Sequence, residues 1–301
     1  MPVEAPLHNA FVVEGIDTVS TLGWVIVAVV EVVHPFASVA VTVYAPADRL
    51  LIVAVVLITA IYVNAQKVFS LHTVRVEGNI AAFEKVQALD HKVAQDAVNK
   101  GDIAFWAALK VEKLDAIDDE KGYNYVFVQW ANSIDELLST KSAWWNNKSK
   151  VLSAAEQEEL NTLSATFTWT KDVRDVYVAE DMLNGSGGDF VQFNFGRPAN
   201  VSGFIAENKA LWKPFYEKNM AKLNMGGWGV SRRLTTGSDA NSPTIMSWDS
   251  FKTMGDLMKY RIGIPLPKEM TDKSKMSQYI PNGFSSQPIF SIIKVTKDAV
   301  K

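Results

Sequence analysis

The sequence contains no cysteine and only four histidines among its 301 residues. Without thiols the chain has no nucleophilic cysteine, no cysteine-ligated zinc and no iron–sulfur cluster. Two of the histidines, His8 and His34, lie in the first 65 residues. The body of the protein therefore has too few imidazoles for a multi-histidine metal site within one chain.

The chain also lacks an excess of charge of one sign. Its first 65 residues carry one arginine and five acidic residues, and the remainder carries 29 basic and 28 acidic residues. No stripe of lysine and arginine is present, so we expect no nucleic-acid partner. The sequence has no Gly-x-Ser-x-Gly, no His-Glu-x-x-His and no Gly-x-Gly-x-x-Gly following a strand. Composition and motifs thus leave open whether the protein is an enzyme.

An apolar run at residues 50–63 dominates the amino-terminal part. Val63 and Ala65 occupy the −3 and −1 positions of a signal-peptidase site, and the run has the length of a signal-peptide core. It is shorter than the ~20 residues of a spanning helix. We therefore expect an exported protein, periplasmic or extracellular, with a mature terminus at Gln66. Because 49 residues precede the run, a membrane anchor retained at residues 22–63 is the alternative.

Downstream of this leader, residues 1–65, the same order of predicted elements occurs twice. Residues 66–183 and 190–301 each show the pattern β-α-β-β-α-β, and a glycine-rich linker, residues 184–189, joins them. A favoured helix cap, Asn79 in the first copy and Asn200 in the second, stands at each strand-to-helix junction. Tryptophans recur at matching places, Trp106 with Trp228 and Trp130 with Trp248.

This element order and the paired tryptophans resemble the dimeric α/β-barrel superfamily, fused into a single-chain pseudo-dimer over roughly residues 68–295. The resemblance implies an α+β fold of two tandem ferredoxin-like units whose antiparallel sheets pack against each other. The superfamily includes cofactor-independent monooxygenases and haem-processing enzymes. One hypothesis is therefore a protein that binds a small apolar or anionic molecule, and the alternative is an enzyme of either kind.

Polar residues on strands that should line a covered sheet locate the candidate site in the second copy. In the first strand of each copy we expect Val68, Val74 and Val76, and likewise Phe193 and Phe195, to lie under the helices. The polar residues then line the space between the sheets, where they bind a ligand or pair with one another. The candidate ligand-binding residues are Gln192, Asn194, Trp212, Tyr216, Trp228, Arg232 and Arg233.

No cofactor is expected apart from haem, which the resemblance alone suggests. His91 lies on the first predicted helix, in the region that supplies a haem ligand in haem-binding relatives. A histidine on a helix surface is the more ordinary interpretation of this residue. The sequence thus predicts a small-molecule partner, and a membrane only if residues 22–63 are retained.

Overall fold

The computed structural model describes residues 66–112, 122–185, 187–235 and 242–299. These residues all belong to one unit, Tyr62–Lys301. The expectations for the leader, namely the signal-like segment 50–65 and the anchor 22–63, lie outside the described residues. None of the helices in the described part is long and apolar enough to cross a bilayer.

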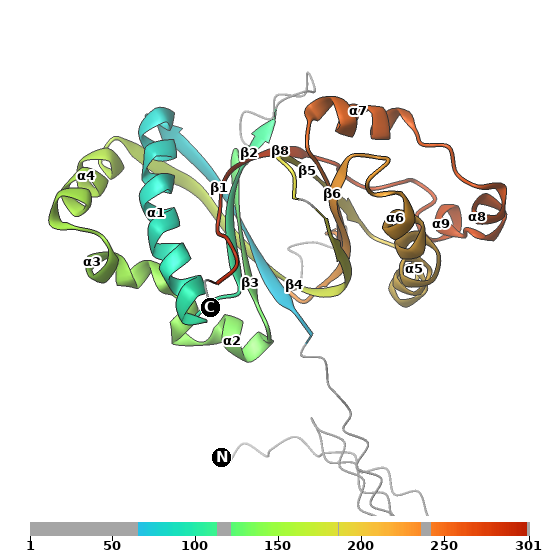
Figure 1. Ribbon diagram of the computed structural model, residues 1–301, viewed down its shortest axis with the longest axis horizontal. Helices are drawn as coiled ribbons and strands as arrows, with labels where there is room; N and C mark the ends of the chain where they lie inside the picture. Colours follow the sequence, from blue (N-terminus) through green and yellow to red (C-terminus); the bar gives the residue numbers. More distant parts are fainter. Residues whose placement is uncertain (1–65, 113–121, 186, 236–241, 300–301) are drawn as a thin grey trace, which may run out of the picture. The chain divides into compact units, whose positions relative to one another are not determined.

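The first half of the unit contains four strands and one long helix (Figure 1). Short helical segments separate the third strand from the fourth. The elements are β1 (Val68–Gly78), α1 (Ile80–Lys100), β2 (Phe105–Glu112), β3 (Tyr125–Ala131), α2 (Ile134–Leu138), η1 (Thr140–Ser142), η2 (Trp144–Asn147), α3 (Lys148–Val151), α4 (Ala154–Ser164) and β4 (Phe167–Asn184).

The second half repeats four strands but divides its first helix into three segments. A π-helical turn, η3, lies between two short α-helices. The elements are β5 (Phe190–Gly196), α5 (Val201–Glu207), η3 (Asn208–Trp212), α6 (Lys213–Asn219), β6 (Met225–Arg233), β7 (Ile245–Phe251), α7 (Met254–Ile262), α8 (Lys268–Lys273), α9 (Met276–Tyr279) and β8 (Ile289–Val295).

The predicted asparagine caps begin both long helical regions. The side chain of Asn79 accepts a hydrogen bond from the amide of Ala82, and that of Asn200 accepts one from Gly203. Each cap satisfies one amide that the first helical turn leaves without a partner. The register of both strand-to-helix junctions is therefore set locally.

The eight strands form one closed antiparallel barrel in the order β1-β3-β2-β8-β5-β7-β6-β4. Strands β2 and β8 pair at one seam between the halves, and β4 and β6 pair at the other. The prediction of an α+β fold with antiparallel strands is confirmed. The two groups of strands are joined edge to edge, however, and do not pack face to face as separate sheets. Closure pairs the strand edges that two open sheets would leave exposed.

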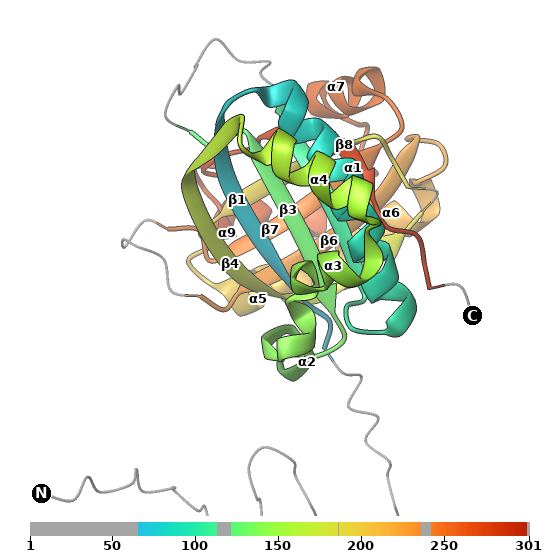
Figure 2. The same cartoon turned by 90° about the vertical axis from the view of Figure 1, so that its left-hand side faces the viewer.

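Helices cover the outside of the barrel on two opposite sides. Figure 1 shows α1, α3 and α4 on one side and α5, α6, α8 and α9 on the other, and Figure 2 looks onto the first group. Apolar side chains accordingly form three main clusters. One lines the barrel interior, one lies under α1–α4 and one lies under α5–α9.

The alternation of side chains on the first strand of each half gives one confirmed prediction and one correction. In β1, Val74 and Val76 lie on the helix side as predicted. In β5 the prediction is wrong, because Phe193 and Phe195 point into the barrel, where Phe193 contacts Phe290 with ring centroids 4.8 Å apart. The barrel interior is the space that needs aromatic side chains to fill it. Residues 192 and 194 therefore face the helices.

Candidate functional site

The outward face of β5 borders a cavity of about 310 Å³ between the barrel and the second group of helices. We call it the helix-side cavity. Its volume is at the lower end of the range of about 300–1,000 Å³ for small-molecule sites. Strands β5, β6 and β7 form its floor, and segments from α5 to α9 form its walls. The polar side chains that line it are Asn194, Asn208, Tyr216, Ser247, Asp249, Tyr260 and Ser277.

Asp249 is the buried acid of the helix-side cavity, with only 3% of its surface exposed. Its Oδ2 accepts a hydrogen bond from Asn194 Nδ2 at 2.7 Å, and the hydroxyl of Tyr260 lies 3.5 Å from its Oδ1. Burial raises the pKa of Asp249 to about 6, and these two neutral donors lower it only partly. A carboxyl group poised near neutral pH can accept a proton and return it.

The orientation of Asn194 is fixed by the groups behind it. Its Oδ1 accepts hydrogen bonds from Gln192 Nε2 at 2.5 Å and from Gln287 Nε2 at 2.8 Å. An amide oxygen so occupied leaves the nitrogen as the group that faces Asp249. The guanidinium of Arg261 in turn donates to Gln192 Oε1 and to the carbonyl of Gln287. A chain of hydrogen bonds thus runs from the Arg261 guanidinium through Gln192 and Asn194 to the buried carboxyl group of Asp249.

Two tyrosines extend this network across the cavity. The hydroxyls of Tyr216, on α6, and Tyr260, on α7, lie 2.6 Å apart. Burial raises the pKa of both phenols, so both remain protonated near neutral pH. The ring of Tyr216 also lies 5.5 Å from Trp228 and 6.1 Å from Trp212. The cavity therefore offers flat aromatic walls with hydroxyl donors at one end.

The π-helical turn η3 shapes the opposite wall of the cavity. Its first residue, Asn208, is 6% exposed and donates from Nδ2 to the carbonyl of Phe204 at 2.9 Å. Such turns are rare and frequently occur at functional sites. The turn interrupts the helical region between α5 and α6 and places both Asn208 and Trp212 on the cavity.

The segment 262–287 lies over the cavity, and five of its residues line it: Met276, Ser277, Ile280, Gly283 and Phe284. Glu207 anchors this segment to α5. Its carboxylate accepts hydrogen bonds from Ser274 Oγ at 2.7 Å and from the Lys275 amide at 2.9 Å. The indole of Trp212 donates to the same carboxylate at 3.2 Å.

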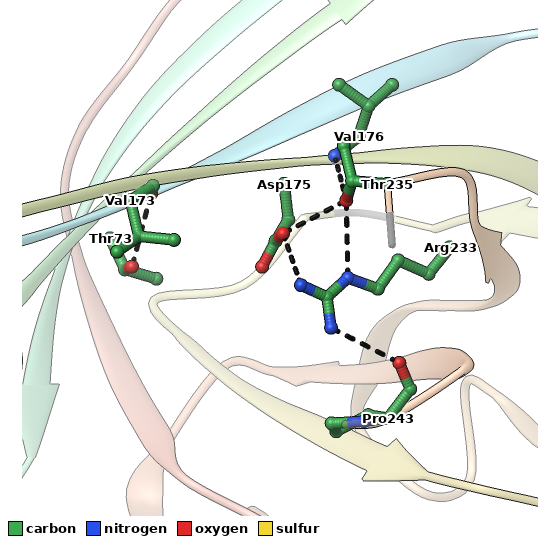
Figure 3. A network of polar contacts seen from close by, with 7 residues as sticks. All are labelled: Thr73, Val173, Asp175, Val176, Arg233, Thr235 and Pro243. Carbon is green, nitrogen blue, oxygen red and sulfur yellow. Dashed lines mark hydrogen bonds and ion pairs between the residues drawn. The ribbon is translucent and has the colours of Figure 1, made fainter. Parts of the chain in front are cut away.

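The structure brings four of the predicted site residues together on the helix-side cavity: Asn194, Trp212, Tyr216 and Trp228. Gln192 lies directly behind Asn194. The two arginines lie elsewhere, at the seam between β4 and β6. Arg232 forms an ion pair with Glu180 at 3.0 Å, while Arg233 pairs with Asp175 and contacts Thr235 (Figure 3).

Sequence analysis missed Asp249, Tyr260 and the role of Asn208. For Asp249 a signal exists, because it lies four residues after Ile245 and two before Phe251 in β7. The three residues therefore share one face of the strand, and both apolar residues are fully buried. A charged residue on the same strand face as two buried apolar residues is itself expected to be buried. Tyr260 has no comparable signal, because α7 is short and several of its faces contain apolar residues.

The residues around His91 do not fit a haem group. His91 Nε2 lies 2.8 Å from the carbonyl oxygen of Val295, so that nitrogen is already engaged. The space between the barrel and α1 is filled by Trp106, Phe127 and Trp144 in mutual ring contact or stacking. The helix-side cavity has no histidine in its lining. Within the described ranges, no cluster of three or more histidine or acidic residues could hold a metal ion.

No protein-family model matches the sequence, and no curated protein matches it. Similar solved structures include candidate monooxygenases from Fusobacterium nucleatum (11% identity, TM-score 0.49, covering 78% of this chain and 96% of that one) and Lactobacillus acidophilus (10%, 0.47, 78% and 97%). A mutant chlorite dismutase from Candidatus Nitrospira defluvii is also similar (10%, 0.38, 75% and 91%). Similarities at this level carry no information about ligand or reaction. The closed barrel itself has the architecture of the dimeric α/β-barrel superfamily that the sequence resembles.

Proposed function

We propose that the protein is a cofactor-independent monooxygenase whose substrate is a flat, mostly apolar molecule with an acidic C–H group. The observation that carries this proposal is Asp249, a buried carboxyl group with a pKa of about 6 facing an aromatic-walled cavity. A base with such a pKa is ionised at pH 7 and close to the operating pH, where proton transfer is efficient. The apolar and aromatic walls of the cavity reduce the solvation of the carbanion by water.

In the proposed reaction, the carboxylate of Asp249 removes one proton from a CH₂ group that is made acidic by conjugation with a carbonyl group. The hydroxyls of Tyr216 and Tyr260 lie at the same end of the cavity and share one hydrogen bond. Once Asp249 holds the proton, Tyr260 can donate to Tyr216, and the hydroxyl of Tyr216 donates to the enolate oxygen. Dioxygen is the oxidant: the carbanion forms a C–O bond with it, and loss of water then gives a carbonyl group. One CH₂ and one O₂ become one C=O and one H₂O, and Asp249 returns its proton to that water.

Anthrone is a suitable test substrate, because it is flat and has an acidic CH₂ opposite its carbonyl group. We expect oxygen uptake and anthraquinone formation faster than in buffer alone. Asp249→Asn should lower kcat about 100-fold or more, the usual contribution of a general base. The matched control is Asp256→Asn, because Asp256 is a carboxylate at the start of α7 that does not line the helix-side cavity. Anthrone binding without turnover would contradict the enzymatic proposal and favour a binding protein.

We also infer that the two halves are copies of one β-α-β-β-α-β unit, as the sequence pattern suggests. Trp106 and Trp228 both lie in the clusters beneath helices, whereas Trp130 and Trp248 both face the barrel interior. This placement supports the inference. An experimental structure should superpose the halves with Trp106 over Trp228, and unrelated positions for that pair would refute the duplication.

For the leader we propose export, supported only by the signal-like residues 50–65. Mass spectrometry of the protein from its native host should then find Gln66 as the amino terminus. Recovery from the membrane fraction with Leu50 still attached would contradict export and favour the anchor.

A further inference from the structure

The interior of the barrel holds a second cavity, of about 500 Å³, which we call the barrel cavity. The barrel wall separates it from the helix-side cavity, and side chains from both halves line it. Most of these side chains are apolar, and Trp130 and Trp248 meet there edge to face with ring centroids 5.7 Å apart. Its main apolar residues are Phe69, Leu71, Phe193, Met246 and Ile292.

The residues that line the barrel cavity are spread along the strands. On β1 its lining runs from Lys67, just before the strand, to Leu71. Four residues of extended chain span roughly 13 Å. Away from the mouth, the side chains that each strand contributes to the lining are apolar. The barrel cavity therefore suits an unbranched apolar chain. A cavity of this size and lining takes small molecules when it is open to solvent.

Polar groups gather only at the mouth of the barrel cavity. Lys67 and Asp298 both line it and are exposed. Within the described ranges neither side chain takes part in an ion pair or a hydrogen bond. Asn184 and Ser250 lie at the same end. A carboxylate head group would meet Asp298, and an ammonium head group would meet Lys67. A neutral head with one acceptor and one donor can satisfy both charges.

We propose that the barrel cavity binds a linear acyl chain that ends in a neutral amide. The chain lies along Phe69 and Leu71, the amide oxygen accepts from Lys67, and the amide N–H group donates to Asp298. This site is independent of Asp249 and of the proposed oxygenase activity.

The first test is calorimetric titration of the full-length protein with hexanamide, heptanamide and octanamide. Each added methylene should lower Kd about fourfold while the slot still has room. Octanoate and octylamine should bind at least about tenfold more weakly than octanamide, which corresponds to about 1.4 kcal/mol. A Kd that does not change with chain length, or equal binding of all three head groups, would overturn the proposal.

The second test places the ligand by mutation. Lys67→Gln should bring the affinity for octylamine closer to that for octanamide, with little effect on octanoate. Asp298→Asn should bring the affinity for octanoate closer to that for octanamide, with little effect on octylamine. These rim substitutions lie at exposed positions, so folding is not at risk. Ala107→Phe should abolish octanamide binding, because Ala107 is 3% exposed and lines the slot. Unchanged head-group preference in both rim variants would refute the site.

Asn194→Ala, in the helix-side cavity, should leave octanamide affinity unchanged. Octanamide should likewise not compete with anthrone. Loss of octanamide binding in Asn194→Ala, or competition between the two ligands, would assign the amide to the helix-side cavity and overturn the barrel site. Failure of anthrone oxidation alone would leave these binding results intact, so the two proposals fail separately.

Discussion

The side-chain amide of Asn194 donates to the carboxyl group of Asp249 at 2.7 Å, with both residues almost completely buried. The oxygen of the same amide is occupied by Gln192 and Gln287. Asn194 therefore presents its nitrogen to Asp249 whatever the protonation state of the acid. The carboxylate gains one strong hydrogen bond but no cation, so desolvation dominates its pKa.

The first prediction concerns pH. The pKa of Asp249 is about 6 when folded and 3.8 in the reference state, so the folded chain holds this proton more tightly. The stability that this group contributes is present below pH 4 and is lost as pH rises through 6. The change amounts to about 3 kcal/mol. Urea unfolding should show that the stability of Asp249→Asn relative to wild type rises by this amount between pH 4 and 7.5.

Asp256→Asn is the control for this measurement. The pKa of Asp256 is lowered, first by its hydrogen bond with Thr253, so its effect on stability has the opposite sign. Its variant should lose stability relative to wild type as pH rises. If Asp249→Asn shows the same difference from wild type at both pH values, the pKa of Asp249 is not raised.

The second prediction separates the two neighbouring arginines. The side chain of Arg233 is 11% exposed and pairs with Asp175, whereas that of Arg232 is 45% exposed. Arg233→Ala should lower the free energy of unfolding by about 1–3 kcal/mol, because it leaves a half-buried carboxylate without its partner. Arg232→Ala should cost less than about 1 kcal/mol. Denaturant unfolding measures both changes.

A double-mutant cycle with Asp175→Ala should assign most of the Arg233 effect to this pair. Neither arginine variant should change anthrone affinity, because both side chains lie outside the helix-side cavity. Loss of anthrone binding in Arg233→Ala with unchanged stability would instead place Arg233 in a ligand site.

The third prediction concerns Gly229. A Cβ atom at this position would lie 2.0 Å from the ring of Trp248, which rests on the backbone of β6. Gly229→Ala should therefore destabilise the protein by about 1–3 kcal/mol through overpacking. Gly255→Ala is the matched control, since its new Cβ meets nothing closer than 3.7 Å and the residue is helical. This control should be neutral or stabilise by up to about 1 kcal/mol. Equal thermal midpoints for the two variants would contradict the packing of Trp248 on β6.

The fourth prediction concerns the segment over the helix-side cavity. Glu207→Ala removes the acceptor for Ser274 Oγ and the Lys275 amide, so residues 268–280 should exchange their amide hydrogens faster. Anthrone should also dissociate faster. Glu217→Ala, at an exposed position on α6, is the control and should leave exchange unchanged. Equal exchange in both variants would show that Glu207 does not anchor this segment.

The sequence predicted local features well where a single residue type has a strong local preference. Asn79 and Asn200 begin helices because their side chains satisfy free amides, an effect that needs no tertiary contact. Strand β4 ends at Asn184 and β5 begins at Phe190, so the glycine-rich stretch of the sequence falls between them.

Part of the candidate site could not be predicted in this way. Gln192 and Asn194 alternate with apolar residues, so they had to share one face of β5. Which face that was depended on the barrel, whose interior takes Phe193 and Phe195. The partners of Arg233 depended on the β4–β6 seam, which joins residues 58 positions apart.

The sequence by itself determined the element order, the helix starts, the alternation along each strand and the polar character of the second half, because these follow from local propensity and periodicity. Only the tertiary structure decided that the strands close into one barrel and that Asn194 and Asp249 face the helices. It also decided that a separate apolar slot lies inside. Those outcomes depend on pairing between distant strands and on which space the large side chains must fill, and neither is encoded in any short stretch of the chain.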